Sequence, residues 1–320
     1  MTTNALPFFD QSTILRSVAI ADLLDAVEAA YRDVAAGRDR SPIRSHVELA
    51  DGSLLLMPGV REGGAGASVK LVTVMPGNAA RQLPTIHALV VWFDAATGRP
   101  IALLDGATVT AMRTGAASGV GARLLSRPDA ETLAVIGAGA QAEWQIRAVL
   151  AARPIRRVTV FARDADRREA FARKMAQATG VVVEAVSDAE SAVRSADIVC
   201  CATTSAEPVF DADWVRPGAH VNGIGAYHLG MVELPPELLA RAAVVAIDSH
   251  EASMAEAGDV VAAIQQGFVA EDSLIEIGTI EREWAETRPS GAITVFKSVG
   301  LAIQDVAAAE LIVARVTAAD

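Results

Sequence analysis

The spacing of apolar residues along the chain changes character near residue 127. Between residues 20 and 36, Leu23, Leu24 and Val27 recur at intervals of three and four, which predicts a helix. Short runs of strand character follow, and the glycine and proline turns between them predict a mainly antiparallel sheet. These runs cover residues 43–49, 53–57, 67–74, 86–93 and 101–105, and a helix of small residues then covers residues 107–125.

After Arg127-Pro128-Asp129, strand and helix patterns alternate, which predicts a doubly wound parallel sheet of the Rossmann type. We therefore expect an α/β chain, and its 320 residues favour two domains. The predicted strands cover residues 133–138, 158–163, 181–186, 198–203, 220–224, 244–248 and 292–296. The predicted helices cover residues 141–152, 165–179, 189–195, 236–242, 251–266 and 299–317.

The first strand of this second part runs into a glycine turn, and a helix follows. Gly137 allows the sharp turn, Gly139 lets the backbone approach a pyrophosphate, and Ala142 lets the helix pack close to the strand. The helix N-terminus adds free N–H groups and a positive dipole end. The sequence thus predicts a dinucleotide site, the alternative being a strand–turn–helix that binds nothing. The expected cofactor contacts are Gly137, Gly139, Gln141, Ala142, Arg163 and Thr203.

The next strand carries the signal for cofactor choice. An NAD site usually has Asp or Glu at the end of this strand, where the carboxylate accepts from the ribose 2′-hydroxyl. Here Ala162 holds that position and Arg163 follows. A missing carboxylate removes the repulsion of a 2′-phosphate, and a guanidinium pairs with that phosphate bidentately. We therefore favour NADP(H), while NAD(H) stays possible if the register is shifted and Asp164 reads the ribose.

Composition excludes several partners. A net charge of −11 does not attract nucleic acid or anionic lipid. The chain shows no signal-peptide pattern and no apolar run near the ~18 residues that a membrane span requires, so we expect a cytoplasmic protein. Cys200 and Cys201 are neighbours in an apolar run, where they point to opposite faces and stay reduced. The sequence contains no closely spaced cluster of metal ligands, so we expect no metal site.

Three cations stand in apolar surroundings of the first domain. Lys70 shares a strand face with valines, Arg113 lies in the small-residue helix, and Arg44 opens the first strand. Singly, each is read as a surface charge whose stem packs on apolar neighbours. Together, they suggest an anionic ligand, most simply a carboxylate. The alternative for Arg113 is an internal ion pair, with Asp105 or Glu48, that serves only the fold.

At this point the chain resembles the ornithine cyclodeaminase and mu-crystallin family over nearly its whole length. Several motifs in one order carry this resemblance, which makes it more specific than the glycine turn alone. The matching stretches are Lys70-Leu71-Val72 with Pro76-Gly77-Asn78, Leu83-Pro84-Thr85, residues 103–106 to 113–116, residues 135–142, and residues 296–302 with Asp305.

The resemblance implies a homodimer whose N-terminal domains join through their sheets. Residues 1–126, with a helix of about residues 300–320 returning to them, then form an α+β substrate-binding and dimerisation domain. Residues 127–299 form the Rossmann NAD(P)-binding domain. Arg44, Lys70 and Arg113 match the family positions that grip the substrate carboxylate.

One departure bears on the reaction. Cyclodeaminases of the family carry a catalytic aspartate after the strand that ends in Asn222-Gly223-Ile224-Gly225. The ungapped position holds Tyr227 here, with His228 next. Tyrosine, with a pKa near 10, is a poor base at neutral pH, whereas a histidine titrates near 6.5. We take Lys70, Tyr227 and His228 as the catalytic candidates, and the alternative for His228 is a surface-loop histidine.

We therefore expect an NAD(P)H-dependent oxidoreductase at a carbon–nitrogen bond next to a carboxylate, within amino acid metabolism. The expected reaction is the reduction of a cyclic imino acid, as in a ketimine reductase, or the dehydrogenation of an amino acid. The alternatives are a true ornithine cyclodeaminase, and a non-catalytic binder of NADPH and small molecules as mu-crystallin is partly regarded.

Overall fold

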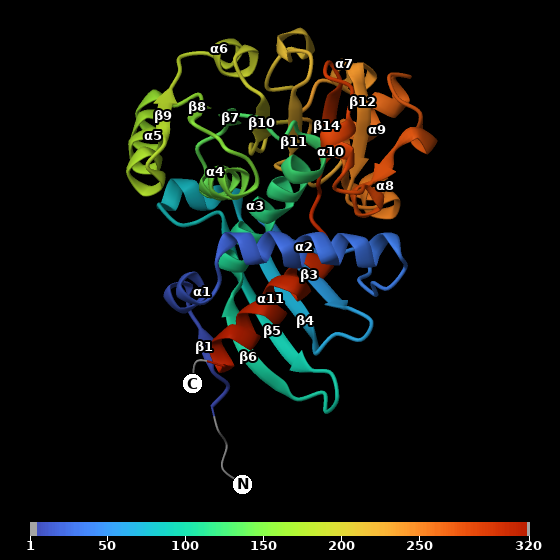
Figure 1. Cartoon of the computed structure of the whole chain (residues 1–320). Helices are drawn as coiled ribbons and strands as arrows, with labels where there is room; N and C mark the ends of the chain where they lie inside the picture. Colours follow the sequence, from blue (N-terminus) through green and yellow to red (C-terminus); the bar gives the residue numbers. More distant parts are fainter. Residues whose placement is uncertain (1–4, 319–320) are drawn as a thin grey trace. The chain divides into compact units, whose positions relative to one another are not determined.

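The computed structural model describes residues 5–318 and divides into two compact units (Figure 1). Unit 1 comprises residues Met1–Arg113 and Leu301–Asp320, and unit 2 comprises Thr114–Gly300. The division falls inside the long helix α3 (Gly106–Leu125), so no linker separates the units along the chain. Over the described residues, no helix combines the length and the apolarity that crossing a bilayer requires.

Unit 1 is built on a six-stranded mixed sheet with the order β1-β6-β5-β4-β3-β2. β1 pairs parallel to β6, whereas the other neighbours are antiparallel. Helices α1 (Gln11–Ser17), α2 (Ile20–Ala35) and α11 (Ala302–Thr317) complete the unit, and α11 packs against α2, β3 and β4. The strands are β1 (Phe8–Phe9), β2 (Ser45–Leu49), β3 (Gly52–Val60), β4 (Gly66–Val74), β5 (Ile86–Asp94) and β6 (Pro100–Asp105).

Unit 2 holds an eight-stranded parallel sheet with the order β13-β12-β14-β11-β10-β7-β8-β9. The strand order reverses between β7 and β10, which is the switch point where doubly wound sheets bind ligands beyond the carboxyl ends of their strands. The strands are β7 (Thr132–Ile136), β8 (Arg157–Phe161), β9 (Val182–Ala185), β10 (Ile198–Cys201), β11 (His220–Gly223), β12 (Ala242–Ile247), β13 (Ile275–Glu276) and β14 (Ile293–Lys297). The helices are α4 (Ala140–Ala152), α5 (Ala165–Thr179), α6 (Ala189–Arg194), α7 (Pro236–Arg241), α8 (His250–Glu256), α9 (Gly258–Gln265) and α10 (Trp284–Thr287).

The glycines of α3 are unfavourable for helix formation, but they allow other elements to pack very close to the helix. A Cβ atom added at Gly115 would lie 2.5 Å from the carbonyl oxygen of Trp144 in α4. A Cβ at Gly121 would lie 2.7 Å from the ring of Phe296 in β14. Both positions therefore exclude any side chain, and other elements of unit 2 lie directly against this helix.

The structure differs from the sequence expectations in several elements. The helix predicted over residues 251–266 is two helices, α8 and α9, because a Cβ at Gly258 would lie 2.1 Å from the carbonyl oxygen of Met231. The chain turns at this contact and begins a second helix. α11 begins at Ala302 instead of residue 299, because Asp248 holds the backbone N–H groups of Val299 and Gly300. The short elements β1, α1, α10 and β13 were not predicted.

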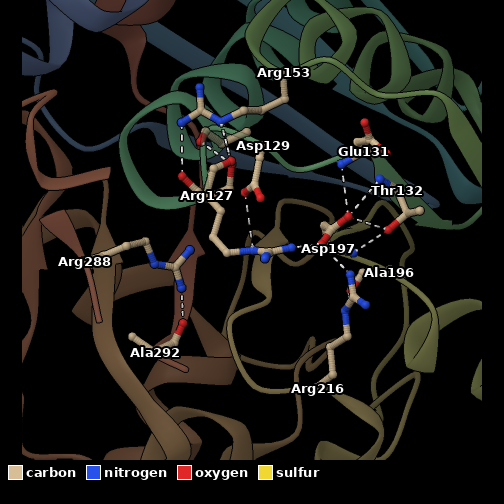
Figure 2. Close-up of polar contacts among 12 residues, drawn as sticks. Arg127, Asp129, Glu131, Thr132, Arg153, Ala196, Asp197, Arg216, Arg288 and Ala292 are labelled. Atoms are coloured by element: carbon tan, nitrogen blue, oxygen red, sulfur yellow. Dashed lines mark hydrogen bonds and ion pairs between the residues drawn. The ribbon is translucent and has the colours of Figure 1, made fainter. Parts of the chain in front are cut away.

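Arginines collect at the amino ends of the strands in unit 2 (Figure 2). Arg127 and Arg216 both pair with the buried carboxylate of Asp197, just before β10. Arg153 donates to the carbonyl oxygens of Arg123 and Ser126 at 2.6 and 3.1 Å, at the C-terminal end of α3. The helices of a doubly wound sheet end at this edge, and the negative ends of their dipoles are stabilised by cations. The cluster therefore balances helix ends and stabilises the edge opposite the glycine turn.

Candidate active site

Lys70 lies near the middle of β4 with its side chain 1% exposed. Alternation along β4 points Lys70, Val72 and Val74 to the face that is buried, as the sequence pattern predicted. The Nζ atom lies 2.8 Å from Oδ2 of Asp305 in α11. An isolated ammonium in this place would be very costly, so this ion pair accounts for a charged side chain inside the unit.

Arg113 shares the carboxylate of Asp305 with Lys70. Its Nε donates to Oδ1 of Asp305 at 3.1 Å, and its Nη1 donates to Oε1 of Gln304 at 2.7 Å. Gln304 in turn donates to the hydroxyl of Tyr31 in α2. The Nη2 atom of Arg113 takes part in neither of these bonds. One side of the guanidinium therefore fixes the side chain, and the other side is left for a further acceptor.

The internal partner of Arg113 is not one of those weighed from the sequence. Asp105 accepts from the backbone N–H of Thr108 at 2.7 Å and thereby stabilises the first turn of α3. The partner is Asp305, which lies 192 residues after Arg113. Asp305, Gln304 and Tyr31 were therefore missed as members of the cluster. The signal in the sequence is the polar pair Gln304-Asp305 inside an otherwise apolar stretch of helix, Ile303 to Ala309.

Two cations of this cluster, Lys70 and Arg113, share the one carboxylate of Asp305. The pKa of Lys70 falls to about 7, first because of burial and then because of the positive charge of Arg113. The ion pair with Asp305 opposes this shift, and Arg44 adds to it. Burial would raise the pKa of Asp305, but the charges of Lys70 and Arg113 hold it below its usual range. The three sequence-predicted cations thus influence one another around one buried carboxylate.

In unit 2 the glycine turn has the geometry expected for a pyrophosphate. Gly137 follows β7 with a φ of 113°, which favours glycine, and a Cβ there would lie 2.6 Å from the carbonyl oxygen of Ala202. Gly139 precedes the first turn of α4, and a Cβ there would meet only Nη2 of Arg167, at 3.9 Å. The Oε1 atom of Gln141 is buried without a hydrogen-bond partner in the described chain. The turn is therefore open on the side where a phosphate would approach.

The arginines after β8 differ in their surroundings. β8 ends at Phe161, and Arg163 is exposed with no hydrogen bond or ion pair to the rest of residues 5–318. Arg167 reaches back and donates to the carbonyl oxygen of Ala138 in the glycine turn at 3.1 Å. Arg168 donates to the carbonyl oxygen of Ala162 at 2.6 Å and stacks on Phe161. Arg163 and Arg167 are therefore available to a ligand, whereas Arg168 supports the strand end.

Asp164, which would bind the ribose of NAD if the register were shifted, stabilises the start of α5. It precedes α5, and its carboxylate accepts from the backbone N–H of Arg167 at 2.9 Å. An Asp in this position stabilises the helix by satisfying one of its free N–H groups. The carboxylate is thus held at the helix start.

The remaining candidates lie in the loops after β10 and β11. Thr203 donates its hydroxyl to the buried carboxylate of Glu233 at 2.8 Å. Tyr227 is half-buried, His228 is exposed, and their rings meet edge to face with centroids 5.5 Å apart. Nδ1 of His228 accepts from the backbone N–H of Gly230 at 3.1 Å, which places the proton of a neutral ring on Nε2. Glu233 itself was not singled out from the sequence.

The two cysteines are buried free thiols, and burial raises the pKa of Cys200 to about 12. Among residues 5–318, no group of three His, Cys, Asp or Glu side chains is placed to hold a metal ion. The side chains suited to chemistry are therefore the cations of unit 1 and the loops at the carboxyl edge of unit 2.

Comparisons with known proteins agree with this arrangement. The profile of the ornithine cyclodeaminase/mu-crystallin family matches residues 8–320. A Delta(1)-pyrroline-2-carboxylate reductase of Bacillus cereus is 35% identical over 302 residues, which cover 93% of each chain. The same enzyme of Thermococcus litoralis, solved with NADH and L-proline, superposes with a TM-score of 0.91 at 31% identity and covers 98% of both chains.

An archaeal alanine dehydrogenase dimer with bound NAD is also similar, with a TM-score of 0.88 at 30% identity over 98% of this chain and 96% of that one. The family, the two-part α/β fold and the oxidoreductase class expected from the sequence are thereby confirmed. The chain belongs to the ornithine cyclodeaminase/mu-crystallin family, among its NAD(P)-dependent reductases and dehydrogenases.

Proposed function

We propose that the protein reduces the carbon–nitrogen double bond of a cyclic imino acid, of the pyrroline- or piperideine-2-carboxylate type, or dehydrogenates an amino acid in the reverse direction. The observation that carries this proposal is the cation cluster of unit 1. Burial and the positive charges of Arg113 and Arg44 lower the pKa of Lys70 although Asp305 pairs with it, and a second anion beside these cations would relieve their repulsion. A substrate carboxylate is such an anion, and Nη2 of Arg113 can receive it.

The chemistry requires a hydride at the imine carbon and a proton at the imine nitrogen. A reduced nicotinamide supplies the hydride when it is bound. Lys70, Arg113 and Arg44 hold the carboxylate and thereby orient the adjacent double bond, and such positioning is a large part of catalysis. With a pKa of about 7, Nζ of Lys70 is suited to release a proton at neutral pH. Tyr227 and His228 are the further candidates for the proton.

For the cofactor, we propose NADP(H) in preference to NAD(H). The exposed guanidinium of Arg163 and the absence of a carboxylate at Ala162 support a 2′-phosphate. Arg167 lies beside the glycine turn and adds a second cation. Solved relatives contain NADH or NAD, so NADH should be assayed beside NADPH.

The deciding experiment measures oxidation of NADPH and NADH with pyrroline-2-carboxylate, piperideine-2-carboxylate and pyruvate plus ammonia. We expect cofactor oxidation that depends on the imino acid, with a secondary amine as product. Proline and ammonia from ornithine without an external reductant would instead indicate a cyclodeaminase. Tight NADPH binding without turnover of any substrate would indicate a binding protein.

We also propose a homodimer joined through the sheet of unit 1. Val47, Leu49, Leu71 and Leu89 are between 37% and 46% exposed. Leu71 and Leu89 are direct cross-strand partners, so they lie on one face, opposite the face that carries Lys70. An apolar face of this kind is typical of an obligate interface. Leu71→Glu should yield a monomer in analytical ultracentrifugation, whereas Leu229→Glu, at an exposed position of unit 2, should leave the dimer intact.

A further inference from the structure

One buried carboxylate gathers four hydrogen-bond donors at the carboxyl edge of unit 2. The side chain of Glu233 is fully buried in the segment between β11 and α7. Its Oε1 accepts from the backbone N–H and the hydroxyl of Thr203, at 2.5 and 2.8 Å. Its Oε2 accepts from the backbone N–H groups of Gly225 and Ala226, at 2.6 and 3.1 Å. Glu233 therefore ties the loop after β10 to the loop after β11.

These donors favour the ionised form of Glu233. Three of them are backbone N–H groups, which can only donate, so only the hydroxyl of Thr203 could accept a hydrogen from a protonated carboxyl. Burial raises the pKa of Glu233, and the positive charge of Lys297 acts in the opposite direction. Lys297 is itself fully buried at the end of β14, with Nζ 2.5 Å from Oδ2 of Asp259. The geometry thus describes a charged acceptor with a cation in the same cluster.

Asp259 fixes the backbone of Glu233. Its Oδ1 accepts from the N–H of Glu233 at 2.5 Å and from the N–H of Leu234 at 3.1 Å. Asp259 lies in the first turn of α9, where a carboxylate is also favoured by the helix dipole. The side chain of Glu233 therefore projects from a backbone that the Lys297–Asp259 pair holds in place.

The loop after β10 lies against the glycine turn on one side and against the loop after β11 on the other. A Cβ at Gly225 would lie 2.0 Å from the carbonyl oxygen of Thr203, so these loops touch backbone to backbone. A Cβ at Gly137 would lie 3.4 Å from Cγ2 of Thr203. Thr203 is thus placed between the phosphate turn and the segment that leads to Tyr227 and His228. Its position depends on the carboxylate of Glu233.

We propose that Glu233 is a positioning residue for the nicotinamide half of the dinucleotide, and this rests on the proposed function. The two halves of a dinucleotide bind on opposite sides of the switch point. β8 and Arg163 stand on the side that takes the adenosine half. The loops after β10 and β11 stand on the other side, and Glu233 sets their separation.

The test is Glu233→Gln in the full-length protein. Glutamine keeps one acceptor oxygen but turns an amide donor toward the N–H groups of one loop, which then moves away. A lost hydrogen bond to a charged group corresponds to roughly tenfold or more, so we expect at least about a tenfold loss of NADPH or NADH affinity and of kcat. The affinity for ADP-ribose or its 2′-phosphate, which lack the nicotinamide, should change by less than about threefold.

Asp197→Asn is the matched control. Asp197 is also a buried carboxylate that accepts from two backbone N–H groups and a threonine hydroxyl, but it lies at the opposite edge of the sheet. This variant should lose thermal stability and keep the ratio of NADPH to ADP-ribose affinity. If Glu233→Gln does not fold, Glu233→Asp is the second variant. It keeps the charge, but its shorter side chain cannot reach both loops. It should therefore show a smaller loss of NADPH affinity, again with little change in ADP-ribose affinity.

Equal losses for NADPH and ADP-ribose in a Glu233 variant, or no loss of either, would overturn the proposal. A selective loss of NADPH affinity in Asp197→Asn, as large as the one in Glu233→Gln, would overturn it as well. The affinity ratio is measured without turnover, so an inactive native protein would defeat the proposed reaction and leave this test intact. A native protein that binds no dinucleotide would defeat both.

Discussion

Lys70 and Lys297 are both buried lysines within a charged cluster, yet the two clusters differ in the sign of their excess charge. Lys70 in unit 1 pairs with Asp305 at 2.8 Å, Arg113 pairs with the same carboxylate, and the charge of Arg44 acts on Lys70. Lys297 in unit 2 pairs with Asp259 at 2.5 Å, and Glu233 adds a second carboxylate. Cations are in excess in the first cluster, and carboxylates are in excess in the second.

The difference lies in what compensates the excess charge. Around Lys297, the backbone N–H groups of Thr203, Gly225 and Ala226 satisfy the extra carboxylate from inside the protein. Around Lys70 the excess is positive, and burial together with the charge of Arg113 lowers the pKa of the lysine. A cluster satisfied by its own backbone fixes structure, whereas a cluster with a charge left over is suited to a ligand.

The largest effect is expected from removing the two lysines in turn. Lys297→Met leaves Asp259 and Glu233 buried without their cation, which should cost about 3–5 kcal/mol of unfolding free energy. Lys70→Met leaves Asp305 paired with Arg113 and should cost about 1 kcal/mol or less, while imino acid reduction is lost. Urea denaturation compares the two variants. Equal losses of stability would show that both lysines serve the fold alone.

The next effect concerns the fork of Arg113. Arg113→Lys keeps the charge near Asp305 but loses the bond to Gln304 and the second N–H edge. We expect kcat/KM to fall by roughly 10²-fold, about 2.7 kcal/mol, with dinucleotide affinity nearly unchanged. Steady-state kinetics and dinucleotide titration measure the two quantities. A variant that only melts earlier and keeps its kinetics would assign Arg113 to structure.

Arg163 and Arg168 extend the comparison to the cofactor. Arg163→Ala should weaken NADPH by about 1.5–3 kcal/mol and leave NADH nearly unchanged, because only NADPH carries the 2′-phosphate. Arg168→Ala should lower the melting temperature without changing the ratio of the two affinities, because Arg168 bonds to Ala162 and stacks on Phe161. Fluorescence titration gives both affinities. Equal affinity of the native protein for NADPH and NADH would remove the basis of this prediction.

The smallest effect is the pH dependence of carboxylate binding. Lys70 is protonated below its pKa of about 7, so the affinity for a carboxylate such as L-proline should be highest there. It should decline as the pH rises through 7, by up to roughly tenfold per unit, which is about 1.4 kcal/mol. Calorimetry from pH 6 to pH 8.5 follows this decline. Lys70→Arg, which does not titrate in this range, should bind with a flat pH profile.

Lys70 also makes stability depend on pH in a defined direction. Its pKa in the folded protein, about 7, lies below the ordinary value of 10.5 that describes the unfolded chain. Between these values the unfolded chain binds more protons, so the contribution of Lys70 to stability rises with pH over this range. The difference in unfolding free energy between the native protein and Lys70→Met, followed over this pH range, measures the contribution of Lys70.

Much of the fold was predictable because the signals are local. The alternation along β4 and the period of α2 depend on which side of one element is buried, and that information is contiguous in sequence. The glycine turn was predictable for the same reason. The break at Gly258 was not, because its cause is a contact with Met231 in another segment.

The cations of the candidate site were predictable individually, and their partners were not. A charge in an apolar run is visible in the sequence, but the sequence does not state which of many carboxylates pairs with it. Asp305 is separated from Arg113 by 192 residues, and Glu233 is defined by backbone N–H groups that it gathers from loops elsewhere. Such residues become recognisable only when the chain is folded.

The return of α11 to unit 1 has a consequence for synthesis on the ribosome. Domains usually fold as units while the chain emerges, beginning with the N-terminal one. Here the sheet of unit 1 is made early, but the carboxylate that compensates Lys70 and Arg113 arrives only with α11, after all of unit 2 has been translated. We therefore expect nascent chains that end before residue 301 to keep unit 1 sensitive to protease, and to gain resistance once α11 has emerged.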